Sequence, residues 1–252
     1  MELIHASDPK NLNQDIKQVV QIVEKLFSFE NGKKDAGSST HFVFNSKKQL
    51  TKEQVYDDAK KLMESTTYEY DITGNLISKI ATNHDGGSGV AINFIYNKSG
   101  QLTNSKTTLS QHKTEIYKYD DMNYLIETKI LDNLDSLWET TYYSYNEKGI
   151  LSSIITKSNK GETTSVDSYL YNNLNQCIQE EHSGQPINCA GRNKWQKKYN
   201  EFGDIIEEKT HDLTVKYKYE YDKKKNWTRQ FSYYNAESAP NFLIERAITY
   251  TK

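Results

Sequence analysis

A short aromatic motif recurs along most of this chain. Its clearest copies read Tyr-x-Tyr-Asp, Phe-x-Tyr-Asn and Tyr-x-Tyr-Asn, each followed by a Gly and then a Leu at fixed positions. The second aromatic of one copy lies 22 to 28 residues from that of the next, most often 26. These aromatics are Phe44, Tyr70, Tyr96, Tyr119, Tyr145, Tyr171, Tyr199 and Tyr221. A period of this length indicates a fold built from copies of one structural unit.

Each position of the motif has a physical reason that points to a hairpin. Aromatics two residues apart lie on the same face of a strand. The Asp or Asn that follows can start a turn, because its side chain bonds its own backbone two residues on. The Gly three residues later tolerates positive φ, and Asn, which replaces it in two copies, is the next best residue there. We assign the turns to Asp71, Gly74, Asn97, Gly100, Asn123, Asn146, Gly149, Asn175 and Gly203.

The repeated hairpin predicts an all-β fold. The apolar residue after each turn starts a return strand, so that eight units give an antiparallel meander of about fourteen to sixteen strands. We expect this meander to form one long twisted or curled sheet, with polar, irregular connections between units, such as 132–136 and 159–162. Residues 1–252 are predicted to form a single domain of these repeats, in which 1–12 is an irregular N-terminal segment.

Two segments carry a competing helical signal. Residues 14–29 place apolar side chains at helical spacing, and 51–63 opens with residues that could cap a helix. The repeat around them favours a leading strand over 19–29 and a hairpin within 51–63. In the first and last copies the left-handed turn position falls on Lys48 and Lys225, and terminal copies of stacked arrays are usually atypical.

At these residues the sequence resembles the YD-repeat proteins, the Rhs and teneurin-like group, and in particular small bacterial members. The segment from Tyr68 to Leu76 matches Tyr-x-Tyr-Asp-x-x-Gly-Asn-Leu without a gap, and the resemblance covers residues 15–250. It implies a repeated β-sheet, which in large members winds into a shell around a toxin or another domain. Eight copies are too few for such a shell, so we do not expect an enclosed cargo. The resemblance implies no catalytic residues and favours bacterial interaction roles.

Charge and hydropathy exclude several classes of partner. The formal net charge is −2, whereas nucleic-acid binders usually carry a basic excess. The one basic stretch, 216–225, alternates with Tyr and is read as a strand with a solvated Lys face. No apolar run approaches the roughly 20 residues of a membrane-spanning helix, and the N-terminus lacks a secretory signal pattern. We therefore predict a cytoplasmic protein with no nucleic-acid partner and no membrane insertion.

No pattern of residues indicates catalysis or a cofactor. The six His are scattered, no Gly-x-Ser-x-Gly is present, and the Gly-rich string at 84–89 lacks the Lys of a phosphate-binding loop. Cys177 and Cys189 cannot complete a zinc site; we read them as two buried thiols, with a cross-strand disulfide as the alternative. The prediction is a non-enzymatic protein without catalytic residues, metal or cofactor.

Binding to another protein is the remaining hypothesis. Adjacent tyrosines face opposite sides of a strand, so a sheet with Tyr on both faces can expose an aromatic contact surface, although core packing explains most such residues. We select Trp138, Tyr142, Trp195 and Tyr233 as candidate partner-binding residues. The leading hypothesis is a toxin-immunity (antitoxin-like) protein that binds a cognate toxin. The alternative is an exported periplasmic or cell-surface protein that binds glycans or envelope components. The oligomeric state stays open.

Overall fold

The regular elements of the structure are all β-strands. The computed structural model describes residues 19–30, 32–84, 89–108, 112–184, 194–235 and 237–251. The strands are β1 (Val19–Glu30), β2 (Lys33–Phe44), β3 (Leu50–Tyr56), β4 (Leu62–Tyr70), β5 (Leu76–Asn83), β6 (Val90–Tyr96), β7 (Leu102–Thr108), β8 (Lys113–Tyr119), β9 (Leu125–Leu131), β10 (Leu137–Tyr145), β11 (Leu151–Ser158), β12 (Thr163–Tyr171), β13 (Cys177–Gly184), β14 (Lys194–Tyr199), β15 (Ile205–Lys209), β16 (Thr214–Tyr221), β17 (Trp227–Tyr234) and β18 (Phe242–Tyr250). Within the described residues, no helix is long and apolar enough to cross a membrane.

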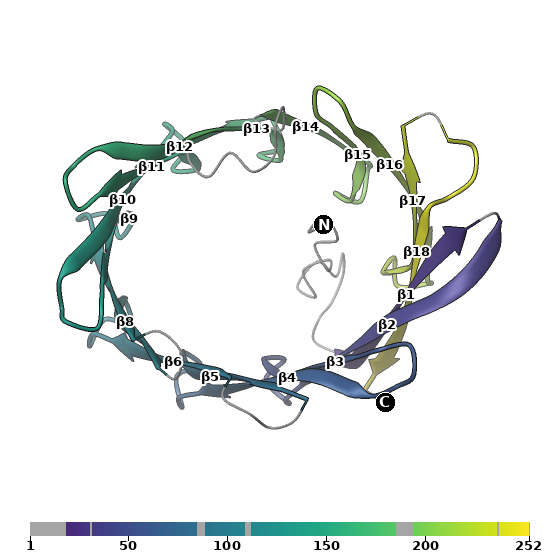
Figure 1. Cartoon of the computed structure of the whole chain (residues 1–252), viewed down its shortest axis with the longest axis horizontal. Coiled ribbons are helices and arrows are strands. Elements are labelled where there is room, and N and C mark those ends of the chain that lie inside the picture. The colour runs from purple at the N-terminus through teal and green to yellow at the C-terminus, as the bar shows by residue number, and fades with distance from the viewer. Residues whose placement is uncertain are drawn as a thin grey trace.

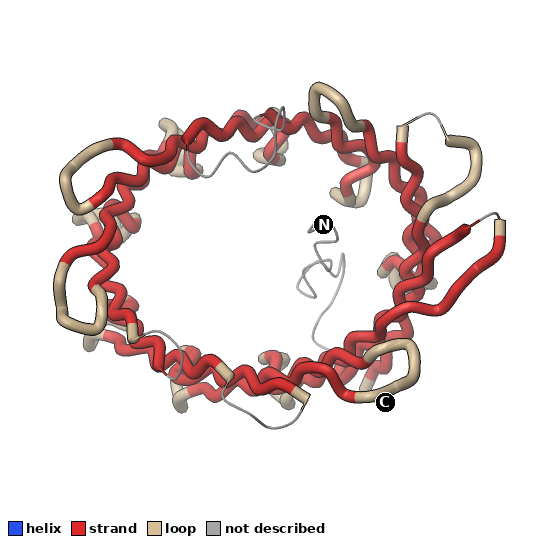
Figure 2. Tube along the Cα trace, viewed as in Figure 1, coloured by secondary structure: helices blue, strands red, loops and turns tan. Residues whose placement is uncertain are grey.

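The sheet closes on itself. Each strand pairs antiparallel with the next in sequence, and β18 pairs with β1 over a register that runs from Val19↔Tyr250 to Ser28↔Phe242. The result is a ring of 18 strands that surrounds a central space (Figures 1 and 2). The all-β antiparallel meander is confirmed, with 18 strands in place of the expected fourteen to sixteen. The predicted long twisted or curled sheet does not stay open, because its first and last strands pair and close it into a barrel.

The closure has a simple origin in the sequence. The eight repeat units supply β2 to β17 in pairs, one pair for each motif turn. The two strands outside the repeats, β1 and β18, then pair with each other and with the ends of the repeat array. An open array would leave two rows of unpaired backbone groups, and closure removes both.

The two ambiguous segments are strands. β1 covers Val19–Glu30, so the leading strand is confirmed. β3 and β4 form the hairpin predicted within 51–63, and its turn begins at Asp57. In both places pairing with neighbouring strands outweighs the local helical spacing, because propensity is a weak prior against tertiary contacts.

The turns of the motif share one geometry. At Asp71 the backbone N–H donates to the Asn75 carbonyl over 2.9 Å, and the Gly74 N–H donates to the Asp71 carbonyl over 3.1 Å. The Asp71 carboxylate accepts the Asn75 N–H over 2.9 Å. Positive φ occurs at the fourth residue of such turns, at Lys48, Gly74, Gly100, Asn123, Gly149, Asn175, Gly203 and Lys225.

The connections at the other end of the barrel are more regular than we expected. Asp57, Asp132 and Ser158 begin turns with the same pair of backbone hydrogen bonds as the motif turns. The fourth residues, Lys60, Asp135 and Gly161, again have positive φ. The prediction of irregular connections at 132–136 and 159–162 is therefore wrong, since an Asp or Ser at the first position is enough to form this turn without the Tyr motif.

The aromatic side chains of the motif lie on the inner face of the barrel. In β16, Tyr217 and Tyr219 line a pocket together with residues from β13 to β18 and from β1. Side chains from so many neighbouring strands can converge on one pocket only on the concave face of the sheet, which is the inside of the barrel. Residues that lie directly opposite each other on paired strands share a face of the sheet, as do Tyr68 and Lys79. The strand registers therefore identify the inward-facing residues of each strand in turn, starting from the pocket.

The second Tyr of the motif joins consecutive repeats. Its hydroxyl donates to a backbone carbonyl about one repeat earlier: Tyr70 to Leu50, Tyr96 to Leu76, and Tyr145 to Leu125, each over 2.8 Å. Tyr199 donates to Cys177 in the same way over 2.6 Å. The aromatic ring thus covers the inner wall while its polar tip satisfies a carbonyl of the adjacent unit.

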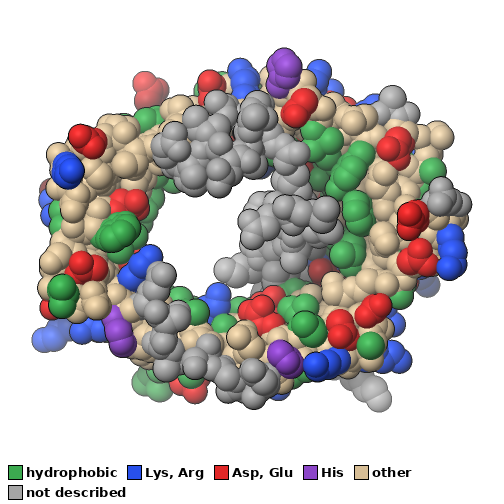
Figure 3. All heavy atoms as spheres, in the orientation of Figure 1, with side chains coloured by type: hydrophobic (Ala, Val, Ile, Leu, Met, Phe, Trp, Pro, Cys, Tyr) green, Lys and Arg blue, Asp and Glu red, His purple; other side chains and the backbone are tan. Residues whose placement is uncertain are grey.

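The barrel is too wide for side chains to fill. Barrels of about 16 to 18 strands leave an open channel, whereas about eight strands are filled by their own side chains. Accordingly, the buried apolar cluster is small and lies near one side of the ring, where Val19 and Ile22 of β1 contact Phe42 of β2. Figure 3 looks down the ring and shows its hollow, with hydrophobic side chains on the inner wall near β15 to β17.

A buried ion pair lies on the seam between β1 and β18. Arg246 donates from Nε to Oε1 of Glu24 over 2.9 Å, and the side chains are 0% and 6% exposed. The guanidinium also stacks on Trp227 of β17, with Cζ 3.4 Å from the ring centroid. Burial lowers the pKa of Arg246, and the nearby Glu24 carboxylate opposes this shift. The seam is thus fixed by charge as well as by backbone pairing.

We expect the Tyr145→Phe variant to be about 1 kcal/mol less stable than the wild type, because the Leu125 carbonyl loses its hydrogen bond. Tyr142→Phe is the matched control, because Tyr142 lies on the same strand, faces outward, and makes no hydroxyl hydrogen bond within the described residues. Urea unfolding measures both free energies of unfolding. Equal losses for the two variants would contradict the proposed role of the inter-repeat bond.

We expect Arg246→Met to cost about 3–5 kcal/mol in the free energy of unfolding, because it leaves the Glu24 carboxylate buried without its cation. The control is Arg229→Met on β17, whose guanidinium is 48% exposed and pairs with Glu220 and Glu245 on the outer face. The loss in free energy of unfolding for Arg229→Met should stay below about 1 kcal/mol, because its ion pairs are exposed to water. A loss for Arg246→Met as small as the control would show that the seam does not depend on this pair.

Candidate functional site

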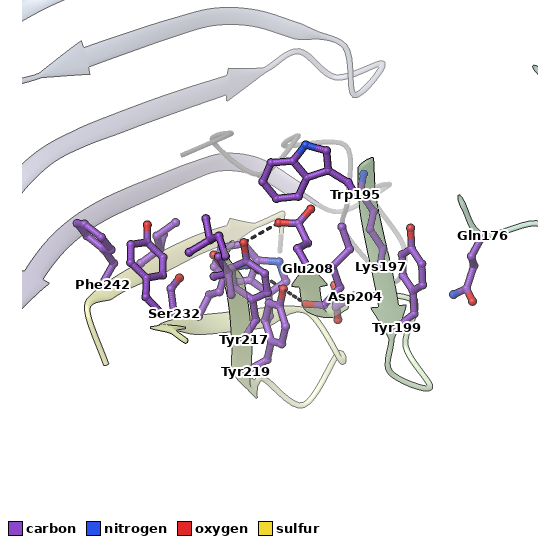
Figure 4. Close-up of a pocket in the computed structure, with 18 of the residues that line it drawn as sticks. Gln176, Trp195, Lys197, Tyr199, Asp204, Glu208, Tyr217, Tyr219, Ser232 and Phe242 are labelled. Atoms are coloured by element: carbon purple, nitrogen blue, oxygen red, sulfur yellow. Dashed lines mark hydrogen bonds between the residues drawn. The ribbon is translucent and has the colours of Figure 1, made fainter. Parts of the chain in front are cut away.

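A pocket of about 630 Å³ lies on the inner wall along β13 to β18 and β1. Seven of its twenty described lining residues are aromatic, and the close-up in Figure 4 labels five of them. The seven are Trp195, Tyr199, Tyr217, Tyr219, Trp227, Tyr234 and Phe242. Concave sites with aromatic walls and a few placed polar groups are typical of ligand-binding surfaces.

Strict alternation along β14 and β16 brings the aromatic side chains to this wall. In β14, Trp195, Lys197 and Tyr199 are half-buried, whereas the residues between them are exposed. In β16, Tyr217 and Tyr219 are half-buried and alternate with the exposed Lys216 and Lys218. The prediction of a strand with a solvated Lys face is confirmed for 216–221, whose Tyr face belongs to the pocket, whereas 222–225 form the turn that follows.

The polar groups of the pocket are held in place by bonds to the barrel. Lys197 donates from Nζ to Oε1 of Glu180 over 2.7 Å. The Tyr217 hydroxyl donates to Oε2 of Glu208 over 2.7 Å, and the Tyr221 hydroxyl donates to Oδ2 of Asp204 over 2.6 Å. The pocket thus presents aromatic rings and oriented carboxylates, and the hydroxyls of Tyr217 and Tyr221 are engaged by those carboxylates.

The tyrosines of the inner wall are kept neutral by their surroundings. Burial is the main cause that raises the pKa of Tyr169 and of Tyr199 to about 12; the next cause is Asp167 for Tyr169 and Cys177 for Tyr199, and Glu180 adds to both. Burial and then Glu208 raise the pKa of Tyr217 further. The thiol of Cys177 also has its pKa raised, first by burial and then by Glu180. At neutral pH these groups contribute neutral surface, and the charge of the pocket comes from its carboxylates and Lys197.

The four candidate partner-binding residues do not form one surface. Trp195 lines the pocket. Trp138 lies at the bulge of β10 and is 63% exposed. Tyr142 faces outward on β10 with the Lys157 ammonium 5.5 Å from its ring centroid, and Tyr233 faces outward on β17 with Lys218 at 4.9 Å.

The cysteines, the Gly-rich string and the histidines add no further site here. Cys177 is a half-buried free thiol, whereas Cys189 and most of the string at 84–89 lie outside the described residues. Within the part of the chain that the structure describes, no group of three or more His, Cys, Asp and Glu side chains is arranged to hold a metal ion.

Most residues of the pocket were not selected from the sequence. Glu180, Lys197, Glu208 and Trp227 come from different strands and meet only because the barrel brings their inner faces together. One signal was available for the tyrosines: Tyr219 is the first aromatic of its motif copy, and Tyr217, two residues before it, shares its face of the strand. Without the closed ring, that face could not be recognised as the wall of a pocket.

Comparison with known proteins shows the fold. No family model matches the chain, and no curated protein matches its sequence. A porin-like protein from Bacteroides uniformis matches with a TM-score of 0.51 and 12% identity over 91% of this chain and 96% of that one. The TcdB2-TccC3 structure matches with a TM-score of 0.41 and 15% identity over 83% of this chain but 11% of that one. The similarity to the porin-like protein extends over almost the whole of both chains and supports the barrel architecture.

We expect stability to fall as the pH rises from about 10 to 12. Tyr169 and Tyr199 have a pKa of about 12 in the barrel against 10.0 in an unfolded chain, so the folded state holds these protons more tightly. Their contribution is complete below pH 10 and is lost as the pH rises through the folded pKa. Tyrosinate absorbance measures this titration, with the chain in denaturant as the reference. If every tyrosine of the folded barrel ionised at the reference pH, the inner wall would not shield them.

Proposed function

We propose that this protein is a non-catalytic binding protein that holds a segment of a polypeptide partner against the inner wall of its barrel. The observation that carries the proposal is the pocket of β13 to β18, which combines several aromatic faces with fixed carboxylates on the inner wall of the barrel. Figure 3 shows hydrophobic side chains on this part of the wall. Aromatic residues are enriched in the contact surfaces of protein complexes because they bury a large area with little loss of side-chain freedom.

The hydrogen bonds of the pocket favour a polypeptide over a glycan. The hydroxyls of Tyr199, Tyr217 and Tyr219 all donate to groups of the barrel itself. Their rings therefore face the pocket with few free donors, whereas a sugar needs many hydrogen-bond partners for its hydroxyls. Apolar and cationic side chains of a peptide match such a surface better.

The outer wall supports a barrel that faces water rather than lipid. Charged side chains occupy its strand positions, among them Lys118, Lys129 and Lys157 on consecutive hairpins and Lys198 and Lys218 farther along. A Lys or Arg on the lipid face of a membrane barrel costs about 2–4 kcal/mol near the bilayer midplane. We therefore propose a cytoplasmic protein that shares the architecture of the porin-like protein and has no transmembrane role.

Within this class we propose a toxin-immunity protein whose partner is a cognate toxin. The support is the sequence resemblance to YD-repeat proteins, together with a turn geometry that recurs at each Tyr-x-Tyr unit. On this proposal the chain is a small relative in which the repeats close a barrel and bind a partner segment at the inner wall.

A photo-crosslinking experiment tests the location of the partner. A photoreactive phenylalanine analogue replaces Trp195 on the inner wall, and in a second protein it replaces Tyr142 on the outer wall. In cells of the source organism, we expect the inner-wall probe to give a discrete adduct with one protein that the outer-wall probe does not give.

Two controls complete this test. The identified protein, once purified, should bind the wild-type barrel and lose most of its affinity for Trp195→Ala. An adduct from the Tyr142 position alone would move the binding surface to the outer wall. If neither position forms an adduct, and the purified barrel instead retains a glycan, the proposed polypeptide partner is wrong.

A further inference from the structure

The charges of the barrel are segregated between its two faces. On the inner face of the described strands, carboxylates outnumber cationic groups. The inner carboxylates are Glu24, Glu30, Asp35, Glu53, Glu64, Glu115, Glu139, Asp167, Glu180 and Glu208, and the inner Lys and Arg residues are Lys33, Lys79, Lys113, Lys197 and Arg246. A net charge of −2 for the whole chain conceals this excess of negative charge on the inner wall.

The outer face has the opposite balance. Its cationic residues are Lys25, Lys34, Lys52, Lys106, Lys118, Lys129, Lys157, Lys194, Lys198, Lys209, Lys216, Lys218 and Arg229. Its acidic residues are Glu69, Glu127, Glu181, Glu207, Glu220 and Glu245. A concave wall of one sign focuses its field into the enclosed space, so the inner wall attracts positively charged groups.

The inner cations near the pocket are already paired. Arg246 is bound to Glu24, and Lys197 is bound to Glu180 over 2.7 Å. The Glu208 carboxylate, unlike those of Glu24 and Glu180, forms no ion pair with a described residue; it accepts a hydrogen bond from the Tyr217 hydroxyl. Glu180, Asp204 and Glu208 line the pocket with Lys197 as the cationic residue among the described lining, which leaves the pocket negative.

The barrel itself shows how this wall binds a cation. The Arg246 guanidinium lies between a carboxylate, Glu24, and the face of an indole ring, Trp227, with Cζ 3.4 Å from the ring centroid. A cation over an aromatic face gains energy from the ring quadrupole, most of all where water is excluded. The pocket repeats this combination of groups with Trp195 and Glu208.

Trp195 and Glu208 are placed to act together. Lys197 of β14 pairs with Glu208 of β15, so Trp195, two residues before Lys197, is the diagonal neighbour of Glu208 on the same face. Diagonal neighbours are about 7–8 Å apart, a separation that one cationic side chain can bridge. Figure 4 shows the Glu208 carboxylate beside the Trp195 indole, with the hydrogen bond from Tyr217 on its other side.

We propose that Trp195 and Glu208 bind the side chain of a Lys or Arg residue in a basic segment of the partner. The inference rests on the proposed function and specifies its partner: a positively charged stretch of polypeptide enters the barrel and places one cationic group on the indole ring and the carboxylate. Tyr217 positions the carboxylate, and the ammonium of Lys197, the residue opposite Glu208, is already bound to Glu180.

Binding of short synthetic peptides to the full chain tests this inference. The probe is a hexa-arginine peptide, the comparison peptides are hexa-lysine and hexa-glutamate, and calorimetry measures the dissociation constants. We expect the two basic peptides to bind and the acidic peptide not to bind. Glu208→Gln keeps the shape of the side chain but removes its charge, and should weaken hexa-arginine binding about tenfold or more. Trp195→Ala should weaken it to a similar degree.

The matched control is Glu181→Gln, which removes a carboxylate from the outer face of the adjacent strand β13. We expect its affinity for hexa-arginine to stay within about twofold of the wild type, because the outer wall is not the site. Thermal unfolding of each variant establishes that the barrel is intact. If Glu208→Gln does not fold, the test compares the dissociation constants of Trp195→Ala and Glu181→Gln for the same peptides, and only the first should be raised.

The outcomes separate this inference from the proposed function. Equal losses for Glu208→Gln and Glu181→Gln, or equal binding of basic and acidic peptides, would overturn the cation site. If a protein adduct still forms at position 195 but its affinity is unchanged in Glu208→Gln, the binding function stands and the cation site fails. If the basic peptides bind as expected but no protein adduct forms at position 195, the cation site stands and the proposed partner is wrong.

Discussion

The pairing of β1 with β18 is the constraint on which the rest of the structure depends. It joins the two strands that lie outside the repeats, and it places Glu24, Arg246 and Trp227 in one buried contact at the seam. An inner face exists only while this seam is closed, because an open sheet would expose both faces to the same solvent. The pocket therefore depends on a contact between the first and last strands, which are more than two hundred residues apart in sequence.

The remaining stability is distributed along the ring rather than concentrated in a core. Few side chains are fully buried, and they cluster near β1, β2 and β16 to β18. Elsewhere each unit contacts its two neighbours through the strand ladder and through the Tyr hydroxyl that donates to the preceding unit. Such a quasi-one-dimensional arrangement makes stability a sum of similar local terms. It also leaves the wall of the central space free to carry polar and charged residues that a packed core would not tolerate.

The sequence predicts the local structure well because each unit specifies itself. Asp71 and Gly74 determine a turn, and Tyr68 and Tyr70 determine which face of β4 is aromatic, without reference to the rest of the chain. Closure could not be predicted in this way, since β1 and β18 lack the motif and their pairing is a long-range event. The site was missed for the same reason: Glu180, Glu208 and Trp227 become neighbours only on a curved wall. Trp195 was selected as an exposed aromatic, and the structure places it on the inner wall instead.

The segregation of charge shows why net charge is a poor guide to the partners of a barrel. Alternation with period two lets each strand carry one sign inward and the other outward, as in β16, where Lys216 and Lys218 face out and Tyr217 and Tyr219 face in. The negative excess of the inner face and the positive excess of the outer face nearly cancel in the net charge, although a ligand on one face does not contact the other. A nearly neutral chain can therefore attract a basic segment to its inside while its outside remains positive. On the proposal of a basic partner segment, the positive excess of the outer wall disfavours binding there, and the negative excess of the inner wall favours binding inside the barrel.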